Sequence, residues 1–259
     1  MSFFWFNLSL SLSLSLSLCM YMCVCVCVCV CVCVYLYPCP RIDQAHKLSI
    51  ICSMVYLQEL LVAGSDTSTS AIEWAMAELL RNPQCMKKAQ AELASEINQD
   101  LIQESDLPRL KFLHACLKES MRLHPPGPLL LPHRAVNSCK VMGYTIPKNS
   151  QVLVNAYAIG RDPKSWKDPL DYKPERFLTS NMDFRGSNIE FIPFGAGRRA
   201  CPGQPMATKH VPLVLASLLH FFDWSLPTGH DPKDIDMSDK FHTSLQKKQP
   251  LLLIPKIKN

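Results

Sequence analysis

The stretch from Phe194 to Gly203, FGAGRRACPG, constrains the fold of this chain more than any other part of the sequence. Glycines and a proline surround Cys201, so the backbone must turn tightly there. The apolar run from Pro205 to Phe222 predicts a helix directly after the turn. A cysteine at the start of a helix, with Arg198 and Arg199 just upstream, lies in a positive field that favours thiolate over thiol. The loop therefore predicts a metal-ligating sulfur at Cys201, with a buried structural cysteine as the alternative.

The spacing within this loop matches a longer pattern, F-x-x-G-x-R-x-C-x-G. Its five fixed positions are Phe194, Gly197, Arg199, Cys201 and Gly203. The pattern resembles the haem-binding signature of the cytochrome P-450 family. The resemblance implies that Cys201 is the axial thiolate ligand of haem iron, where a thiolate pushes electron density onto the metal and favours O–O bond cleavage.

The same resemblance assigns roles to the neighbours of the cysteine. Gly195, Gly197 and Gly203 would let the backbone approach the porphyrin and donate N–H groups to the sulfur, which tunes the reduction potential. Arg199 would pair with a haem propionate, and Phe194 would pack beside the sulfur. The implied cofactor is haem b, iron protoporphyrin IX.

Composition excludes several other classes of protein. The chain has 259 residues and a net charge of +5 without any basic run, so nucleic acid is not an expected partner. Of its thirteen cysteines, six alternate with valine between Cys23 and Val34, and no C-x-x-C pair occurs anywhere. This distribution predicts neither a zinc site nor a disulfide framework.

Residues 1–40 form a low-complexity segment without charge, and the first charged side chain is Arg41. Leucine alternates with serine from Leu8 to Leu18, and cysteine alternates with valine from Cys23 to Val34. A repeated dinucleotide in the DNA encodes such an alternation of two residues, so residues 1–40 are interpreted as a translated repeat. The segment is also long enough to be a membrane anchor, and an aggregation-prone tail is a further alternative. We therefore separate residues 1–40 from a domain at residues 41–259.

A long helix is predicted from about Val55 to Asn82, because apolar residues recur there at spacings of three and four. Its middle, residues 63–68, reads AGSDTS and is a poor helix sequence, since these side chains compete for backbone hydrogen bonds. This stretch resembles the distal-helix motif of the family, which implies that Asp66 and Thr67 deliver protons during oxygen activation. A kink or a helix cap is the alternative interpretation.

Two further motifs lie between this helix and the cysteine loop. Residues 84–99 predict a charged helix with a solvated face, and the next helix runs from about Ser105 to His124. Glu119 and Arg122 lie on one side of that helix. With Arg176 they resemble the structural triad of the family, in which a buried charge is paired on several sides.

Short strands are predicted at residues 128–135, 141–146 and 151–154, and the apolar stretches around residues 243–245 and 251–254 predict a hairpin in the tail. The resemblance places His133 where a propionate-binding side chain is expected; an ordinary surface histidine is the alternative. Small and apolar residues are assigned to the substrate pocket: Ala63, Gly64, Leu129, Leu130, Leu131 and Thr243.

The resemblance covers residues 56–259, and the wording of residues 154–163, VNAYAIGRDP, is similar to the plant microsomal geraniol 8-hydroxylase-like group. It implies a mainly α fold with small β-sheets (α+β), the C-terminal portion of the family fold without its N-terminal half. The implied function is a haem-thiolate monooxygenase at the endoplasmic reticulum membrane. The enzyme would insert one atom of O2 into a small hydrophobic substrate, expected to be a terpenoid, with electrons from NADPH–cytochrome P-450 reductase. A non-hydroxylating haem-thiolate enzyme and an inactive fragment or pseudogene product are the alternatives.

Overall fold

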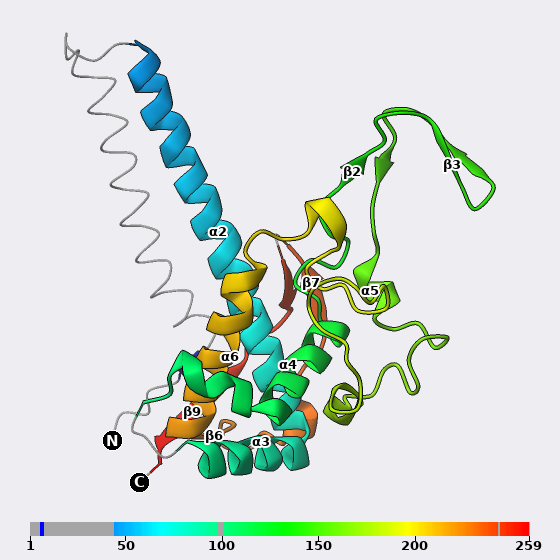
Figure 1. Ribbon diagram of the computed structural model, residues 1–259. Coiled ribbons are helices and arrows are strands. Elements are labelled where there is room, and N and C mark those ends of the chain that lie inside the picture. The colour runs from blue at the N-terminus through cyan, green and yellow to red at the C-terminus, as the bar shows by residue number, and fades with distance from the viewer. Residues whose placement is uncertain (1–5, 8–43, 98–100, 243, 259) are drawn as a thin grey trace.

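The computed structural model describes residues 6–7, 44–97, 101–242 and 244–258 (Figure 1). The earlier expectations for residues 1–40 lie outside these residues, apart from the short strand β1 (Phe6–Asn7). Among the described residues, no helix is both long enough and apolar enough to cross a membrane.

The long helix α2 (Gln44–Arg81) runs through the molecule (Figure 1). It begins eleven positions before the predicted start at Val55, because no glycine or proline between Pro40 and Gly64 interrupts helix propagation. The half of α2 from Ser70 to Leu80 is buried, whereas Leu57 and Leu60 on the other half are 58% and 65% exposed. The helix is therefore a core element at one end and a bare apolar surface at the other.

Three more helices complete the core around the buried half of α2: α3 (Pro83–Glu96), α4 (Lys111–Leu123) and α6 (Gln204–Phe221). The 3-10 helix η1 (Glu104–Arg109) leads into α4. The carboxylate of Glu92 on α3 accepts hydrogen bonds from the backbone N–H groups of Phe112 (2.7 Å) and Leu113 (2.9 Å), so it caps the start of α4. The predicted solvated face of α3 thus contributes one of its carboxylates to packing.

The described strands form small antiparallel sheets. The sheet with three strands has the order β1–β9–β6, and Phe222 in β6 lies opposite Ile257 in β9. The remaining strands pair as β2 with β5, β3 with β4 and β7 with β8. The bounds are β2 (His133–Arg134), β3 (Cys139–Val141), β4 (Tyr144–Ile146), β5 (Gln151–Val152), β6 (Phe222–Ser225), β7 (Asp239–Phe241), β8 (Leu245–Lys247) and β9 (Leu252–Ile257).

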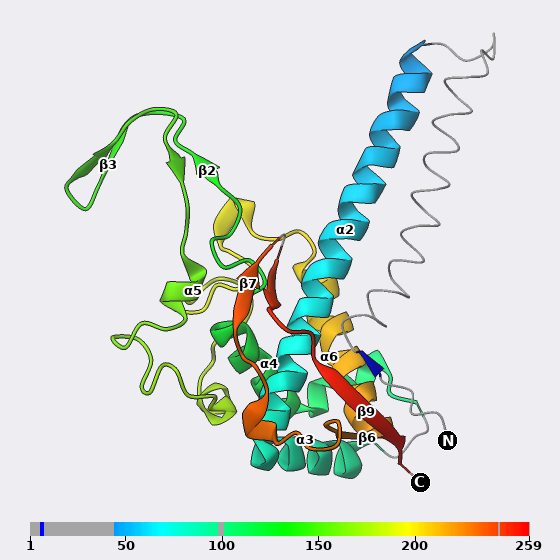
Figure 2. The same cartoon turned by 180° about the vertical axis from the view of Figure 1, so that it is seen from behind.

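The tail of the chain differs from the predicted hairpin. Its two apolar stretches join different sheets, since β8 pairs with β7 and β9 pairs with β6. Figure 2 shows β7 beside α2, with β9 running from there towards the C-terminus. The tail therefore lies along the buried half of α2, and β8 contacts this helix directly.

Short helical turns connect the remaining segments: α5 (Ala156–Ile159), η2 (Pro174–Phe177), η3 (Gly197–Arg199) and η4 (Pro232–Asp234). The hairpin of β3 and β4 projects from the body of the molecule (Figure 1). The fold is mainly helical with small sheets, as the sequence predicted.

Candidate functional site

The cysteine loop is held in shape by its own backbone. The N–H of Cys201 donates to the carbonyl of Phe194 at 2.8 Å, which closes the loop, and the N–H of Gly195 donates to the carbonyl of Ile192 at 2.9 Å. A third bond joins Ala200 N–H to the carbonyl of Gly197 within η3. Cys201 is exposed at the end of this closed loop, immediately before α6. The loop therefore presents the sulfur on a backbone whose shape is already set.

The glycines of the loop serve different purposes. Gly195 and Gly197 have φ angles of +73° and +70°, which other residues adopt only with strain. Gly203 has a φ of −80°, so its conformation does not require glycine. A Cβ built on Gly203 would lie 3.7 Å from the sulfur of Cys201. Gly203 thus leaves space beside the sulfur, and the other two glycines shape the turn.

Gly186 lies outside the cysteine loop in sequence but packs against it, and our sequence analysis missed this residue. Its φ is +75°, and a Cβ there would lie 2.7 Å from the carbonyl oxygen of Gly195 and 3.0 Å from the Cα of Ala196. The backbone of Gly186 packs so closely against the backbone of Gly195 and Ala196 that only glycine, which has no Cβ, fits there. The glycine in the polar stretch DFRGSN was the only signal in the sequence.

The side chains around Cys201 give the loop a positive charge. Arg198 and Arg199 are both exposed, and neither forms an ion pair with any residue that the structure describes. Burial raises the pKa of Cys116 strongly and also raises the pKa of Cys85, so these two thiols are poor ligands. Of the cysteines that the structure describes, Cys201 and Cys139 are exposed, and Cys139 lies on the projecting hairpin.

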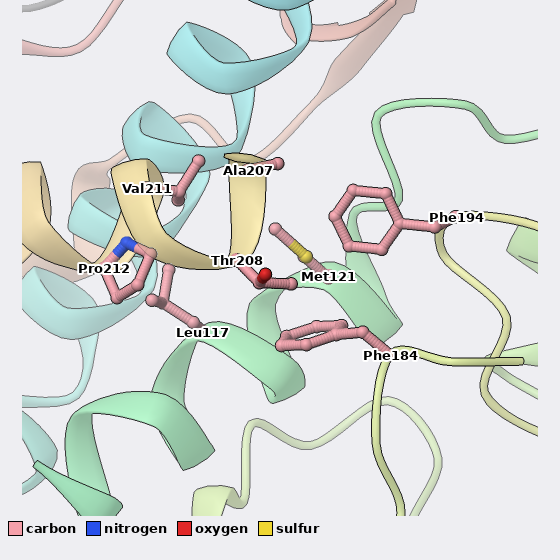
Figure 3. Close-up of a pocket in the computed structure, with 8 residues that line it drawn as sticks. All are labelled: Leu117, Met121, Phe184, Phe194, Ala207, Thr208, Val211 and Pro212. Atoms are coloured by element: carbon pink, nitrogen blue, oxygen red, sulfur yellow. The ribbon is translucent and has the colours of Figure 1, made fainter. Parts of the chain in front are cut away.

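Phe194 packs into the protein from the start of the loop. Its ring meets the ring of Phe184 edge to face, with centroids 5.5 Å apart. Both rings line a small apolar pocket between α4 and α6 (Figure 3). The other residues of its lining are Leu117, Met121, Ala207, Thr208, Val211 and Pro212. Phe194 thereby packs the start of the cysteine loop against side chains of α4 and α6.

The residues predicted on the distal helix lie on its exposed part. Ala63, Gly64 and Thr67 are exposed, and a Cβ built on Gly64 would meet nothing within 4 Å. The hydroxyl of Thr67 donates to the carbonyl of Ala63 at 2.6 Å, and Ser65 makes the same type of bond to Leu61 at 2.7 Å. These hydroxyls bond back to carbonyl groups of their own helix, and α2 nevertheless continues through the weak sequence without a break.

Asp66 is directed to a different place from Thr67. Its carboxylate accepts hydrogen bonds from the hydroxyl of Ser244 at 2.8 Å and from the side-chain amide of Gln246 at 2.9 Å. The acid and the alcohol of the predicted pair therefore have separate surroundings, one at the tail and one at the open helix face.

The segment after α4 carries the other predicted contacts. Leu129 and Leu130 are half-buried, and Leu131 is 80% exposed. A Cβ built on Gly195 would lie 3.6 Å from Cδ1 of Leu130, so this leucine packs against the cysteine loop. His133 is exposed in β2, opposite Val152. Thr243 lies outside the described residues.

The structure brings Glu119, Arg122 and Arg176 together. The Glu119 carboxylate accepts bonds from Nε and Nη2 of Arg122, both at 2.8 Å, and from Nε of Arg176 at 3.0 Å. Glu119 and Arg122 are completely buried, and Arg176 is 15% exposed. The ring of Trp166 lies against both guanidinium groups. The three charges are thus paired with one another inside the protein.

This cluster joins α4 to the segment that precedes the cysteine loop. Arg122 also donates to the carbonyl groups of Gly160, Pro169 and Asp171, and the backbone N–H of Lys173 donates to Glu119 at 2.8 Å. A side chain on Gly160 would collide with the backbone carbonyl of Arg122. Hydrogen bonds from the cluster therefore hold the backbone of residues 160–176, most of which lies outside regular helices and strands.

The residues of the loop fit a cofactor held by a single sulfur. One exposed cysteine suits a metal whose other ligands come from a macrocycle, and two arginines without ion pairs in the described part of the chain suit an anionic rim. The fold and the loop therefore define a helix-rich protein that presents one exposed cysteine beside two unpaired arginines of the described chain.

Comparison with known proteins names the family. The family model described as Cytochrome P-450 matches residues 42–254. The chain is 56% identical to a geraniol 8-hydroxylase from Swertia mussotii over 74% of its length, and 51% identical to an (S)-N-methylcoclaurine 3'-hydroxylase from Papaver somniferum over 78% of its length. This chain belongs to the cytochrome P-450 family, and the family implies a haem-iron cofactor.

The matches correspond to the C-terminal part of the relatives. The chain spans 39% of the Swertia protein and 42% of the Papaver protein. A zebra fish cytochrome P-450, solved with abiraterone, superposes with a TM-score of 0.71 at 33% identity, covering 84% of this chain and 48% of that one. The described fold is therefore part of the family fold.

Proposed function

We propose that this chain supplies the thiolate loop and the distal helix of a haem-thiolate monooxygenase. The observation that carries the proposal is the exposed Cys201 on a loop closed by its own N–H bond to Phe194. Haem b, when bound there, supplies the activation of O2 and the insertion of one oxygen atom into a C–H bond of the substrate. NADPH–cytochrome P-450 reductase is the proposed electron donor, and the endoplasmic reticulum membrane is the proposed location.

The chain's own residues would hold the cofactor at its sulfur and at its rim. Cys201 binds the iron, and Arg199 and His133 pair with propionates. Arg199 is exposed and, among the residues the structure describes, has no carboxylate partner, so its guanidinium is free for an anion. Gly195 and Gly197 keep the turn tight below the ring, and Gly203 leaves room beside the sulfur.

Thr67 is the proposed proton carrier next to the reacting atoms. Its hydroxyl hydrogen points to the carbonyl of Ala63, so the lone pairs of its oxygen are available to accept a hydrogen bond from a water molecule, which would itself deliver the proton. Asp66, the acid of the predicted pair, lies next to Thr67 in sequence but bonds to the tail.

The proposed substrate is a small apolar molecule of the terpenoid class. Relatives named for geraniol and for geranylhydroquinone, both of which contain a terpenoid geranyl group, are 56% and 54% identical to this chain over their matched parts. The proposed walls are Ala63 and Gly64 on α2 and Leu129, Leu130 and Leu131 after α4, together with Thr243. Small and aliphatic side chains at these positions suit an apolar ligand.

A reduced carbon monoxide difference spectrum tests the proposal. Protein that has been reconstituted with haem should show the Soret band of a thiolate-ligated haem, and Cys201→Ala should abolish it. Cys139→Ala, which removes the exposed cysteine of the hairpin, and Cys116→Ala, which removes a buried one, should keep the band. The assignment fails if Cys201→Ala retains the band, or if Cys139→Ala loses it.

A polypeptide without catalysis is the second candidate. The observation in its favour is the exposure of Leu57 and Leu60 on the half of α2 that would face the substrate. A distal surface open to water cannot exclude solvent from the reaction. Absence of any thiolate band in the reconstituted wild-type protein would favour this candidate.

A further inference from the structure

Four polar side chains follow one another along α2 at intervals of four residues: Asp66, Ser70, Trp74 and Glu78. Residues four apart lie one above the other on a helix, so the four form a continuous stripe. We call this set the α2 stripe. Ser70, Trp74 and Glu78 are buried and Asp66 is half-buried, although polar groups are costly to bury without partners.

The upper part of the stripe holds the tail of the chain. Asp66 accepts hydrogen bonds from Ser244 and Gln246, one on each carboxylate oxygen. Both donors are neutral, so the carboxylate acts here only as an acceptor and bridges two residues of the tail. Ser244 and Gln246 flank Leu245, which lies in β8.

The middle of the stripe, Ser70 and Trp74, binds the backbone of Leu245. The hydroxyl of Ser70 and the indole N–H of Trp74 both donate to the carbonyl of Leu245, at 2.6 Å and 2.9 Å. The N–H of Leu245 donates to the carbonyl of Pro126, also at 2.9 Å. The backbone N–H and carbonyl of Leu245 therefore both bond to residues far away in sequence, and α2 supplies both donors to the carbonyl.

The lower part of the stripe holds the end of α4. The ring of His124 stacks on Trp74 with centroids 3.8 Å apart and planes at 1°, and its Nε2 lies 2.8 Å from Oε1 of Glu78. The same stripe thus fixes the tail on one side and, through His124, the start of the segment that carries Leu129 and Leu130.

We propose that the α2 stripe sets the position of tail residues 244–246 against the distal helix, and that Asp66 is its outermost positioning residue. In sequence, the tail residue directly before Ser244 is Thr243, which we assign to the substrate pocket, so the inference deepens the proposed function and rests on it for that last step. The hydrogen bonds themselves do not depend on the cofactor.

Two substitutions of Asp66 test whether its hydrogen bonds hold the tail in place. Asp66→Asn removes the acidic group, but its carbonyl still accepts from Gln246 and its amide can donate to the hydroxyl of Ser244. Asp66→Ala removes both bonds. A positioning role therefore predicts that the tail keeps its protection from amide exchange in Asp66→Asn and loses it in Asp66→Ala.

The experiment is hydrogen–deuterium exchange of the purified chain in mild detergent without haem. The readout is the amide exchange of a peptide that covers residues 244–247, with a peptide from α4 as the reference for global opening. In Asp66→Ala we expect the tail peptide to exchange about tenfold faster with no change in α4, which corresponds to about 1.4 kcal/mol of local stability. Asp66→Asn should stay within about threefold of wild type.

Control variants make the outcome unambiguous. Glu59→Ala removes an exposed carboxylate from the same helix and should leave the tail exchange unchanged. Ser244→Ala removes one bond from the tail side and should add little when combined with Asp66→Ala, since the two share one interaction. Wild-type exchange in Asp66→Ala, or equal acceleration in Asp66→Asn and Asp66→Ala, would overturn the proposal. Because no haem is present, a failure here is independent of the spectroscopic test of Cys201.

Discussion

His124 shows how one buried side chain couples stability to pH. It lies between Trp74 and Glu78, and its Nδ1 is buried without a hydrogen-bond partner in the described part of the protein. Burial lowers the pKa of His124, and the Glu78 carboxylate opposes the shift only in part. The folded protein therefore favours the neutral ring, with Nε2 donating to Glu78.

This shift predicts a loss of stability on mild acidification. The unfolded chain takes up a proton on His124 near its ordinary pKa of 6.5, before the folded chain does, so the free energy of unfolding falls as the pH drops through that value. The contribution of one group is at most about 1.4 kcal/mol per pH unit. Urea unfolding between about pH 8 and about pH 5.5 should show a smaller loss in His124→Gln than in wild type.

The difference between wild type and His124→Gln reports the titration of His124 alone. His114 also has a pKa lowered by burial, but it is present in both proteins and cancels in the difference. Identical pH profiles for wild type and His124→Gln would show that His124 titrates alike in the folded and unfolded states.

At the scale of the elements, the buried charge cluster of Glu119, Arg122 and Arg176 joins α4 to the segment before the cysteine loop. Glu119→Ala would leave Arg122 charged and completely buried, and breaking a buried pair costs about 3–5 kcal/mol. Urea unfolding measures the loss. The matched control is Glu175→Ala, which removes the same charge from an ion pair with Lys88 whose side chains are half exposed, and should cost about 1 kcal/mol or less. Equal losses in the two variants would contradict a special role for the buried cluster.

The elements themselves were largely predictable, because their signals are local. The apolar spacings in α2 and α4 and the prolines that follow them predict where both helices end to within one residue. The helix predicted to start at about Ser105 is divided into the 3-10 helix η1 and α4, which starts at Lys111. The early start of α2 was missed because the residues before Val55 show no clear apolar period, although no breaker stops the helix there. The tail strands were predicted near their observed places but with the wrong partners, since pairing depends on which sheet edge lies nearby.

At the scale of the whole molecule, the exposed half of α2 governs behaviour in solution. Val55, Leu57, Leu60 and Leu61 are between 41% and 65% exposed on one helix, and contiguous apolar patches of this kind promote association. We predict that residues 1–259 expressed alone aggregate without detergent and retain haem weakly. Size-exclusion chromatography and the molar ratio of haem to protein measure both properties.

A chimera supplies the control for this prediction. Joining residues 56–259 to the N-terminal part of a close relative should cover the exposed half of α2 and restore both solubility and a stoichiometric haem content. Soluble, monomeric and fully haem-loaded protein from residues 1–259 alone would contradict the prediction.

The sequence by itself determined the family, the cysteine loop and the helices. Positive φ at Gly195 and Gly197, the charge beside Cys201 and the spacing of Glu119 and Arg122 all arise within one turn or one helix. Such features depend on neighbouring residues and on backbone geometry, so they are visible in the order of residues. The pairing of Arg176 with Glu119, 57 positions away, was reached only through the resemblance to the family.

Only the tertiary structure decided which distant groups meet. Asp66 and Ser244 are 178 positions apart, and no local pattern indicates that their side chains bond to each other. The capping of α4 by Glu92 and the support of Gly195 by Gly186 are of the same kind. Polar side chains bond to whatever donor or acceptor the packing of apolar surfaces brings within about 3 Å. That packing is a property of the whole chain, and local spacing does not encode it.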